Sequence, residues 1–321
     1  MKDNVILVTG ATGQIGSELV PEMRAKFGKE NVIVGVHNRP PSEGLEDGPY
    51  TIVDVTMRGT VERAVVDYKV DIIYHMAAIL SAAGERNPWL AWDVNINGTY
   101  NVLEVAREHK LMRVFCPSSI AVFGPETPRV NTPQETVLKP RTIYGVTKVV
   151  GELLCNYYWE KFKLDVRGMR YPGIISNKTL PGGGTTDYAV EIFYEAIKHG
   201  KYKCFLREDS TLPMMYMPDC IKATLDLMDA PLENLKHHCD FNVNALSFSP
   251  RDLAEEIKRH IPDFKITYEP DYRQAIADSW PMSLDDSAAR EEWGWKPSYD
   301  LPSMVEDMLK VLREKHAKEL L

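Results

Sequence analysis

Tyr144 and Lys148 are the pair of side chains in this sequence best suited to proton transfer. They are four positions apart, so on a helix they share one face about one turn apart. A free tyrosine loses its proton only near pH ~10. A neighbouring ammonium favours the phenolate, so Tyr144 beside Lys148 is a candidate catalytic base at neutral pH.

A glycine-rich turn near the N-terminus is the second chemical signal. Gly10, Gly13 and Gly16 follow the apolar run 5–8 and precede an amphipathic stretch. Such glycines permit a tight turn, let the backbone approach a pyrophosphate and let the helix pack on the strand. The phosphates then meet free N–H groups at the helix N-terminus, so the turn predicts a dinucleotide site.

The segments after the second, third and fourth expected strands bear on which dinucleotide binds. No carboxylate stands in 34–40, where an acid is expected to bind the adenosine ribose; Asn38 is a candidate for a ribose hydroxyl and Arg39 for a 2′-phosphate. The alternative, that both begin an exposed loop, remains open, and with it the choice of NAD or NADP. Asp54 is placed for the adenine amino group, and Ala77 and Ala78 are small enough for close approach of the dinucleotide.

Alternating strands and helices organise the first half of the chain. Short apolar runs at 5–8, 32–34, 51–53, 71–74, 114–116 and 164–169 are typical of buried strands. Amphipathic stretches at 15–27, 61–68, 93–109 and 144–162 separate most of them. This predicts an α/β fold of Rossmann type, with a doubly wound parallel sheet. We expect a dinucleotide-binding domain over 1–170 and a smaller, mainly substrate-binding lobe over 171–321, with segments that return to the sheet.

Composition excludes several classes of function. The 321 residues carry a net charge of −8, which argues against nucleic acid or an anionic membrane surface as the main partner. The apolar runs are too short to span a bilayer, and an expected strand at residue 4 leaves no room for a signal peptide. Five scattered cysteines without a C-x-x-C pair indicate a reduced, cytoplasmic protein with no zinc site.

These motifs together resemble the extended short-chain dehydrogenase/reductase superfamily, and the resemblance runs nearly end to end. Ser119 lies 25 positions before Tyr144, which matches the superfamily's serine-to-tyrosine spacing. The other matching positions are Gly10, Gly13 and Gly16, the pair Asp54-Val55, the run 75–78, Asn95, the pair Ser118-Ser119, Tyr144 and Lys148, and the run 170–173.

One subfamily fits more closely, the short-chain type of L-threonine 3-dehydrogenase. The runs 171–176, 181–189, 212–217, 278–281 and 284–290 match it, and they lie in the expected substrate lobe. The resemblance implies oxidation of L-threonine by NAD to 2-amino-3-oxobutyrate, with no metal. One departure is the stretch 36–38, where these enzymes usually carry a Ser-Asp pair. That stretch bears on cofactor preference rather than on the chemistry.

The resemblance assigns roles to individual residues. Tyr144 is the base, Lys148 lowers the pKa of the tyrosine and binds the nicotinamide ribose, and Ser119 stabilises the developing oxyanion. The expected cofactor-binding residues are Gly10, Thr12, Gly13, Gln14, Ile15, Gly16, Asn38, Arg39, Asp54, Val55, Met76, Ala77, Ala78, Asn95, Lys148 and Tyr171. The expected substrate-binding residues are Leu80, Ser81, Ser118, Ser119, Tyr144, Gly184, Thr185, Thr186 and Trp280.

Several of these residues have a structural alternative. Ser118 faces the substrate or is structural. Asn95 kinks its helix and holds a water for proton relay, or it is a buried asparagine satisfied by backbone. Residues 182–187 either cap the following helix or bind the substrate carboxylate at the base of a mobile lid. Trp280 covers the site or packs in the small lobe. His75 is expected to be buried rather than catalytic.

Two other functions are compatible with this fold, and the resemblance also implies an assembly state. A nucleotide-sugar epimerase or dehydratase shares the fold and the Ser/Tyr/Lys set, but it needs cationic residues for a diphosphate, and the stretch 210–216 has no arginine. A non-catalytic dinucleotide-binding regulator would typically lose the Tyr/Lys pair. In the superfamily the helices that correspond to 93–109 and 144–162 pair across a two-fold axis, which implies a homodimer.

Overall fold

The computed structural model describes residues 4–38, 40–41, 44–178, 180, 182 and 184–320. The chain separates into two compact units, each built from more than one stretch of sequence. Unit 1 comprises residues 1–122, 141–170 and 223–241, and unit 2 comprises 123–140, 171–222 and 242–321.

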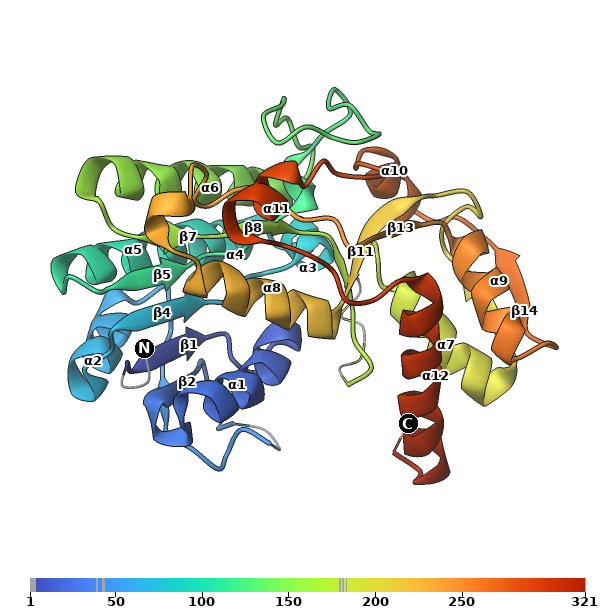
Figure 1. Cartoon of the computed structure of the whole chain (residues 1–321), viewed down its shortest axis with the longest axis horizontal. Coiled ribbons are helices and arrows are strands. Elements are labelled where there is room, and N and C mark those ends of the chain that lie inside the picture. The colour runs from blue at the N-terminus through green and yellow to red at the C-terminus, as the bar shows by residue number, and fades with distance from the viewer. Residues whose placement is uncertain are drawn as a thin grey trace. The chain divides into compact units, whose positions relative to one another are not determined.

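Unit 1 is built on a parallel sheet of six strands in the order β3-β2-β1-β4-β5-β7. The labelled strands β2, β1, β4, β5 and β7 follow one another in this order in Figure 1. Each pair in the sheet is parallel, and the order reverses between β1 and β4, where ligands bind in doubly wound sheets. The strands are β1 (Ile6–Thr9), β2 (Val32–Val36), β3 (Tyr50–Ile52), β4 (Ile72–His75), β5 (Arg113–Phe115) and β7 (Val166–Arg167). The predicted Rossmann-type sheet is confirmed.

The helices of unit 1 follow the predicted alternation, with one interruption. The stretch expected as one helix at 93–109 contains a π-helical segment, Asp93–Asn97, before α5. The other elements that lie wholly in unit 1 are α1 (Gln14–Phe27), α2 (Arg58–Tyr68), α3 (Ser81–Arg86), α4 (Pro88–Trp92), α5 (Gly98–Glu108), β6 (Ser118–Ser119) and α6 (Ile143–Phe162), with 3₁₀ turns at Lys29–Asn31, Ile120–Val122 and Leu232–Asn234. Three elements continue from one unit into the other: β8 (Met169–Tyr171), α8 (Met217–Asp229) and β12 (Phe241–Asn242).

The core of unit 1 lies between the sheet and helices α2, α5 and α6. Alternate strand residues face these helices, because successive side chains of a strand point to opposite faces of the sheet. Leu7, Ile33, Ile73, Val114 and Val166 form one buried cluster with apolar residues of the three helices. The buried residues of α1 lie outside this cluster and pack beside β1 and β2.

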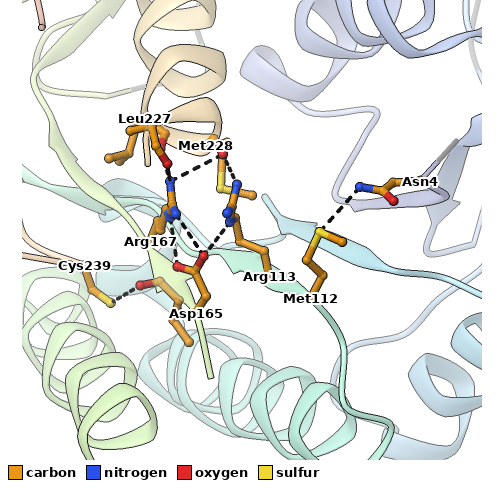
Figure 2. Close-up of polar contacts among 10 residues, drawn as sticks. Asn4, Met112, Arg113, Asp165, Arg167, Leu227, Met228 and Cys239 are labelled. Carbon is orange, nitrogen blue, oxygen red and sulfur yellow. Dashed lines mark hydrogen bonds and ion pairs between the residues drawn. The ribbon is translucent and has the colours of Figure 1, made fainter. Parts of the chain in front are cut away.

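Two arginines fix the C-terminal end of α8 within unit 1 (Figure 2). The fully buried Arg167 donates to both carboxylate oxygens of Asp165 at 2.8 and 2.9 Å, and to the Leu227 and Ala230 carbonyls, both at 2.7 Å. Arg113 joins Asp165 to the Met228 carbonyl. A guanidinium satisfies the last carbonyls of a helix and is attracted to the negative end of its dipole.

Unit 2 contains two small sheets and a set of helices. In one sheet β11 pairs with β9 in parallel and with β13 antiparallel, and in the other β10 and β14 are parallel. Its elements are β9 (Gly173–Ile175), α7 (Tyr188–His199), β10 (Lys201–Cys204), β11 (Leu212–Tyr216), β13 (Leu246–Phe248), α9 (Pro250–His260), β14 (Lys265–Tyr268), α10 (Arg273–Asp278), α11 (Ser287–Trp293) and α12 (Leu301–Ala317). Among the described residues of both units, no helix combines the length and apolar character needed to cross a membrane.

Candidate active site

The glycine turn is shaped by close backbone approaches. Gly10 has φ +62°, and a Cβ there would lie 2.6 Å from both Cα and N of Ala77. A Cβ on Gly16 would lie 2.6 Å from the Gly10 carbonyl oxygen. Gly10 therefore lets the turn reach the chain after β4, and Gly16 lets α1 pack on the turn.

The first turn of α1 is available to an anion. Gly13 is the N-cap, and no side chain of the described residues caps it. Thr12 and Gly13 are exposed. Free N–H groups and the positive end of the helix dipole suit a phosphate, so the turn fits the pyrophosphate of a dinucleotide.

The ends of β2 and β3 form the expected adenosine side. Asn38 is exposed after β2, and Arg39 lies outside the described residues. The Asp54 carboxylate accepts from the Thr56 hydroxyl at 2.7 Å and from its backbone N–H at 3.0 Å, and it lies 3.5 Å from His37. Burial raises the pKa of Asp54, but the Thr56 hydrogen bonds and His37 outweigh it and hold the pKa below its usual range.

Val55, the neighbour of Asp54, is part of the core. It is buried, and a Cβ on Gly98 would lie 2.7 Å from a Val55 methyl group. This side chain therefore positions α5 against the chain after β3. The cofactor contacts assigned to Asp54 and Val55 stay predictions.

His75 ends β4 and is buried between two threonines. Its Nδ1 lies 2.9 Å from the Thr9 hydroxyl and its Nε2 lies 3.1 Å from the Thr99 hydroxyl. Burial, with a smaller contribution from the Lys148 charge, lowers the pKa of His75 to about 3. The imidazole is neutral at physiological pH, as expected of a buried structural histidine.

Asn95 ties together three segments from its place in the π-helical turn. Its amide accepts from the Ile79 N–H at 2.8 Å, and it donates to the Ile79 carbonyl and to the Thr147 hydroxyl, both at 3.0 Å. The buried side chain thus joins the chain after β4 to α6. This geometry favours a buried asparagine whose hydrogen bonds are satisfied within the protein over one that holds a water for proton relay. The contact of Asn95 with the cofactor stays a prediction.

Helix α6 brings Tyr144 and Lys148 together. Its N-cap, Thr142, accepts from the Gly145 N–H at 3.0 Å. Lys148 is one helical turn after Tyr144. Its ammonium lies 5.7 Å from the centroid of the Tyr144 ring and donates to the Pro117 carbonyl at 2.7 Å. The predicted pair is therefore adjacent, and its cation is anchored to the segment that leads to Ser119.

The two serines of β6 face different partners. The half-buried Ser119 accepts from the Ala121 N–H at 3.2 Å. The buried Ser118 donates to the Glu152 carboxylate at 2.5 Å. This contact favours a structural role for Ser118 over a role in facing the substrate.

A pocket in unit 1 is lined by five of the predicted site residues, and Ser119 and Tyr144 are not among its lining residues. Ala77, Ala78, Asn95, Ser118 and Lys148 line it. The pocket is also lined by residues outside the sequence motifs: Thr99, Cys116, Pro117, Thr147, Gly151, Glu152, Cys155 and Cys239. Gly151, Glu152 and Cys155 follow Lys148 at positions i+3, i+4 and i+7, a helical spacing that was a usable signal in the sequence.

Leu80 and Ser81 follow the pocket-lining alanines along the chain. Leu80 is half exposed and precedes the first residue of α3, and its carbonyl accepts from the Gly84 N–H at 2.7 Å. Ser81 is buried. Their substrate contacts stay predictions.

The other predicted residues belong to unit 2. The Gly184 N–H donates to the Asp187 carboxylate at 2.6 Å, just before α7. Thr185 is buried, and Thr186 lies against Gly173, where a Cβ would come within 2.7 Å of it. Gly184, Thr185 and Thr186 therefore form a compact turn, and their part in substrate binding stays a prediction.

Tyr171 and Trp280 are both buried side chains. The Trp280 carbonyl accepts from Arg129 at 3.0 Å within unit 2. Burial of Trp280 favours packing in this unit, and the cofactor contact assigned to Tyr171 stays a prediction. Among the described residues no cluster of three or more histidine, cysteine, aspartate or glutamate side chains is arranged to hold a metal ion.

Known proteins match this sequence over almost the whole chain. Residues 6–243 match the NAD dependent epimerase/dehydratase family. Mitochondrial L-threonine 3-dehydrogenase of Bos taurus is 49% identical over 305 residues, 95% of this chain and 81% of that protein. An uncharacterized epimerase/dehydratase of Staphylococcus saprophyticus is 49% identical over 318 residues, 98% of this chain and 99% of that protein.

A solved structure is similarly close to this chain in sequence and in fold. The L-threonine dehydrogenase of Phytophthora infestans is 52% identical with a TM-score of 0.94, and the match covers 97% of this chain and all of that one. The family model matches most of the chain, and the relatives and the solved structure are about half identical to it. The chain therefore belongs to the NAD dependent epimerase/dehydratase family.

Proposed function

We propose that the protein is an NAD-dependent L-threonine 3-dehydrogenase, which converts L-threonine and NAD to 2-amino-3-oxobutyrate, NADH and a proton. The observation that carries the proposal is the arrangement on α6, with the Lys148 ammonium 5.7 Å from the Tyr144 ring and held by the Pro117 carbonyl two residues before Ser119. Relatives and solved structures at about half identity are L-threonine dehydrogenases, which supports this substrate.

Bound NAD supplies the hydride acceptor. Tyr144 takes the proton of the substrate's β-hydroxyl as the general base, with the Lys148 ammonium 5.7 Å from its ring. Ser119 donates a hydrogen bond to the reacting oxygen, where negative charge develops as the proton leaves. Lys148 is oriented by the Pro117 carbonyl, so its position is set before substrate arrives.

The cofactor fits unit 1 on structural grounds. Gly10 has no side chain to stand over the turn where it approaches Ala77. The first turn of α1 is not capped by a side chain, so its N–H groups can bind a pyrophosphate. Gly10, Gly13 and Gly16 would hold that group, and Asp54 the adenine.

The test is a direct assay with a matched tyrosine control. Mixing protein, NAD and L-threonine should raise the absorbance of reduced nicotinamide. Tyr144→Phe should lower kcat by about 10²-fold or more, the range for losing a general base, while NADH still binds. Tyr272→Phe changes an exposed tyrosine of unit 2, away from α5 and α6, and should leave kcat unchanged. Near-normal turnover of Tyr144→Phe would contradict the role of the phenol.

A nucleotide-sugar epimerase or dehydratase is the second candidate, because the staphylococcal relative carries that name. Such a site needs cationic side chains for a diphosphate. The strand β11 (Leu212–Tyr216) is instead apolar and buried throughout. Consumption of a UDP-sugar without NAD reduction by threonine would favour this candidate, and cofactor binding with neither activity would favour a non-catalytic regulator.

We also propose a homodimer through α5 and α6. These helices expose large apolar side chains, including Tyr100, Leu153, Tyr157 and Phe162. Exposed apolar clusters of this kind mark interaction surfaces. Light scattering should give twice the chain mass, and Leu153→Glu should lower it, whereas Val66→Glu on the exposed face of α2 should not.

A cytoplasmic location is the remaining proposal. All five cysteines are free and buried, which suits a reducing compartment. Fractionation of the native host, followed by immunodetection, would test it.

A further inference from the structure

The buried carboxylate of Glu152 has no part in the reaction described above. Glu152 continues the face of α6 that carries Tyr144 and Lys148, because the three residues stand four positions apart. Its side chain is 3% exposed. A charge buried this deeply is costly unless it is paired and hydrogen-bonded, so its partners show what it holds.

Two groups from distant parts of the chain bind this carboxylate. Arg170 donates to both oxygens at 2.9 Å, in the bidentate geometry that gives the strongest and most directional ion pairs. Ser118 donates its hydroxyl to Oε1 at 2.5 Å. Burial raises the pKa of Glu152, while the Arg170 charge and the Ser118 hydrogen bond act in the opposite direction.

The Ser118 contact acts on the segment that carries the proposed oxyanion donor. Helix α6 holds this segment at two points: Lys148 donates to the Pro117 carbonyl at 2.7 Å, and Glu152 accepts from Ser118. Ser119 is the next residue. Because β6 is only two residues long, these two contacts constrain the direction of the Ser119 side chain relative to α6.

We propose that Glu152 is a positioning residue, which acts through Ser118 to hold the Ser119 hydroxyl in register with Tyr144 and Lys148. The inference rests on the proposed dehydrogenase function. Arg170 fixes the rotamer of Glu152, so the carboxylate is a rigid support. A misplacement of about 1 Å at a reacting group can cost about 10²-fold in rate.

Ser118→Ala is the cleanest test, because it removes the hydroxyl and leaves the Glu152–Arg170 ion pair in place. We expect kcat to fall about 10- to 100-fold, with the KM for L-threonine changed less than about twofold. Ser247→Ala removes an exposed hydroxyl of unit 2 and should change neither value. A raised KM with unchanged kcat would show that Ser118 contacts substrate directly, and it would overturn the proposal.

A double-mutant cycle separates positioning from general stability. If Glu152 acts through Ser118, the double variant Ser118→Ala/Glu152→Gln should lose no more kcat than Glu152→Gln alone. Additive losses would contradict this route. If Glu152→Gln does not fold, the split between kcat and KM in Ser118→Ala decides the question.

A third measurement needs neither substrate nor cofactor. Amide hydrogen exchange across residues 118–121 should be faster in Ser118→Ala than in the wild type, and unchanged in Ser247→Ala. Unchanged exchange in Ser118→Ala would refute the support of this segment by Glu152. If the wild type does not reduce NAD with threonine, the proposed function fails, and the exchange measurement still tests the positioning.

Discussion

Gly10→Ala tests the turn that we propose holds the cofactor pyrophosphate. Two costs add at this position. A residue other than glycine at φ +62° costs about 1–2 kcal/mol. The new methyl would also lie 2.6–2.8 Å from three backbone atoms of Met76 and Ala77, and overpacking of this kind costs about 1–3 kcal/mol. We therefore expect a loss of about 2–5 kcal/mol in the free energy of unfolding, together with weaker NAD binding.

Substitutions at three other glycines distinguish the cost of the positive φ from the cost of the close backbone contacts. Gly200→Ala keeps the positive φ of +63° with nothing within 4 Å of its Cβ, so it should lose only about 1–2 kcal/mol. Gly16→Ala is crowded at 2.6 Å within a helix, and the gain in helix propensity offsets part of that cost, which leaves about 0–2 kcal/mol. Gly59→Ala is exposed and open, and should be neutral or slightly stabilising.

Urea unfolding of the four variants, with NAD titration by fluorescence, measures these differences. Gly10→Ala should be the most destabilised, and NAD should bind more weakly to it and to Gly16→Ala than to Gly200→Ala. If Gly10→Ala were as stable as Gly59→Ala and bound NAD normally, the close approach of the turn to Ala77 would not be the reason for glycine there.

Three further predictions concern unit 1. Asn95→Ala should cost about 2–4 kcal/mol in urea unfolding, because it leaves both backbone groups of Ile79 without their buried partner. His75 is protonated below about pH 6.5 in the unfolded chain but resists protonation in the fold until about pH 3. Stability should therefore fall as the pH drops through this window, and His75→Gln should flatten the fall in acid unfolding curves. Asn38→Asp places a carboxylate of the same shape after β2, so it should raise the KM for NADP more than the KM for NAD, and equal changes would exclude this residue from the ribose site.

The sequence by itself determined the parts of the protein that depend on local pattern. Strand–helix alternation predicted the parallel sheet, and glycine spacing located the turn whose backbone approaches Ala77. Helical spacing brought Tyr144 next to Lys148. These features follow from steric and periodic rules that act within about one or two turns of chain.

Only the tertiary structure decided which distant side chains meet. Ser118, Glu152 and Arg170 share one buried network, and Asn95 bridges Ile79 and Thr147, although no local pattern links these positions. Residues 123–140 likewise group with unit 2 rather than with their chain neighbours. The physical reason is that a buried polar group must find partners wherever the folded chain brings them, and that choice depends on how separate elements pack.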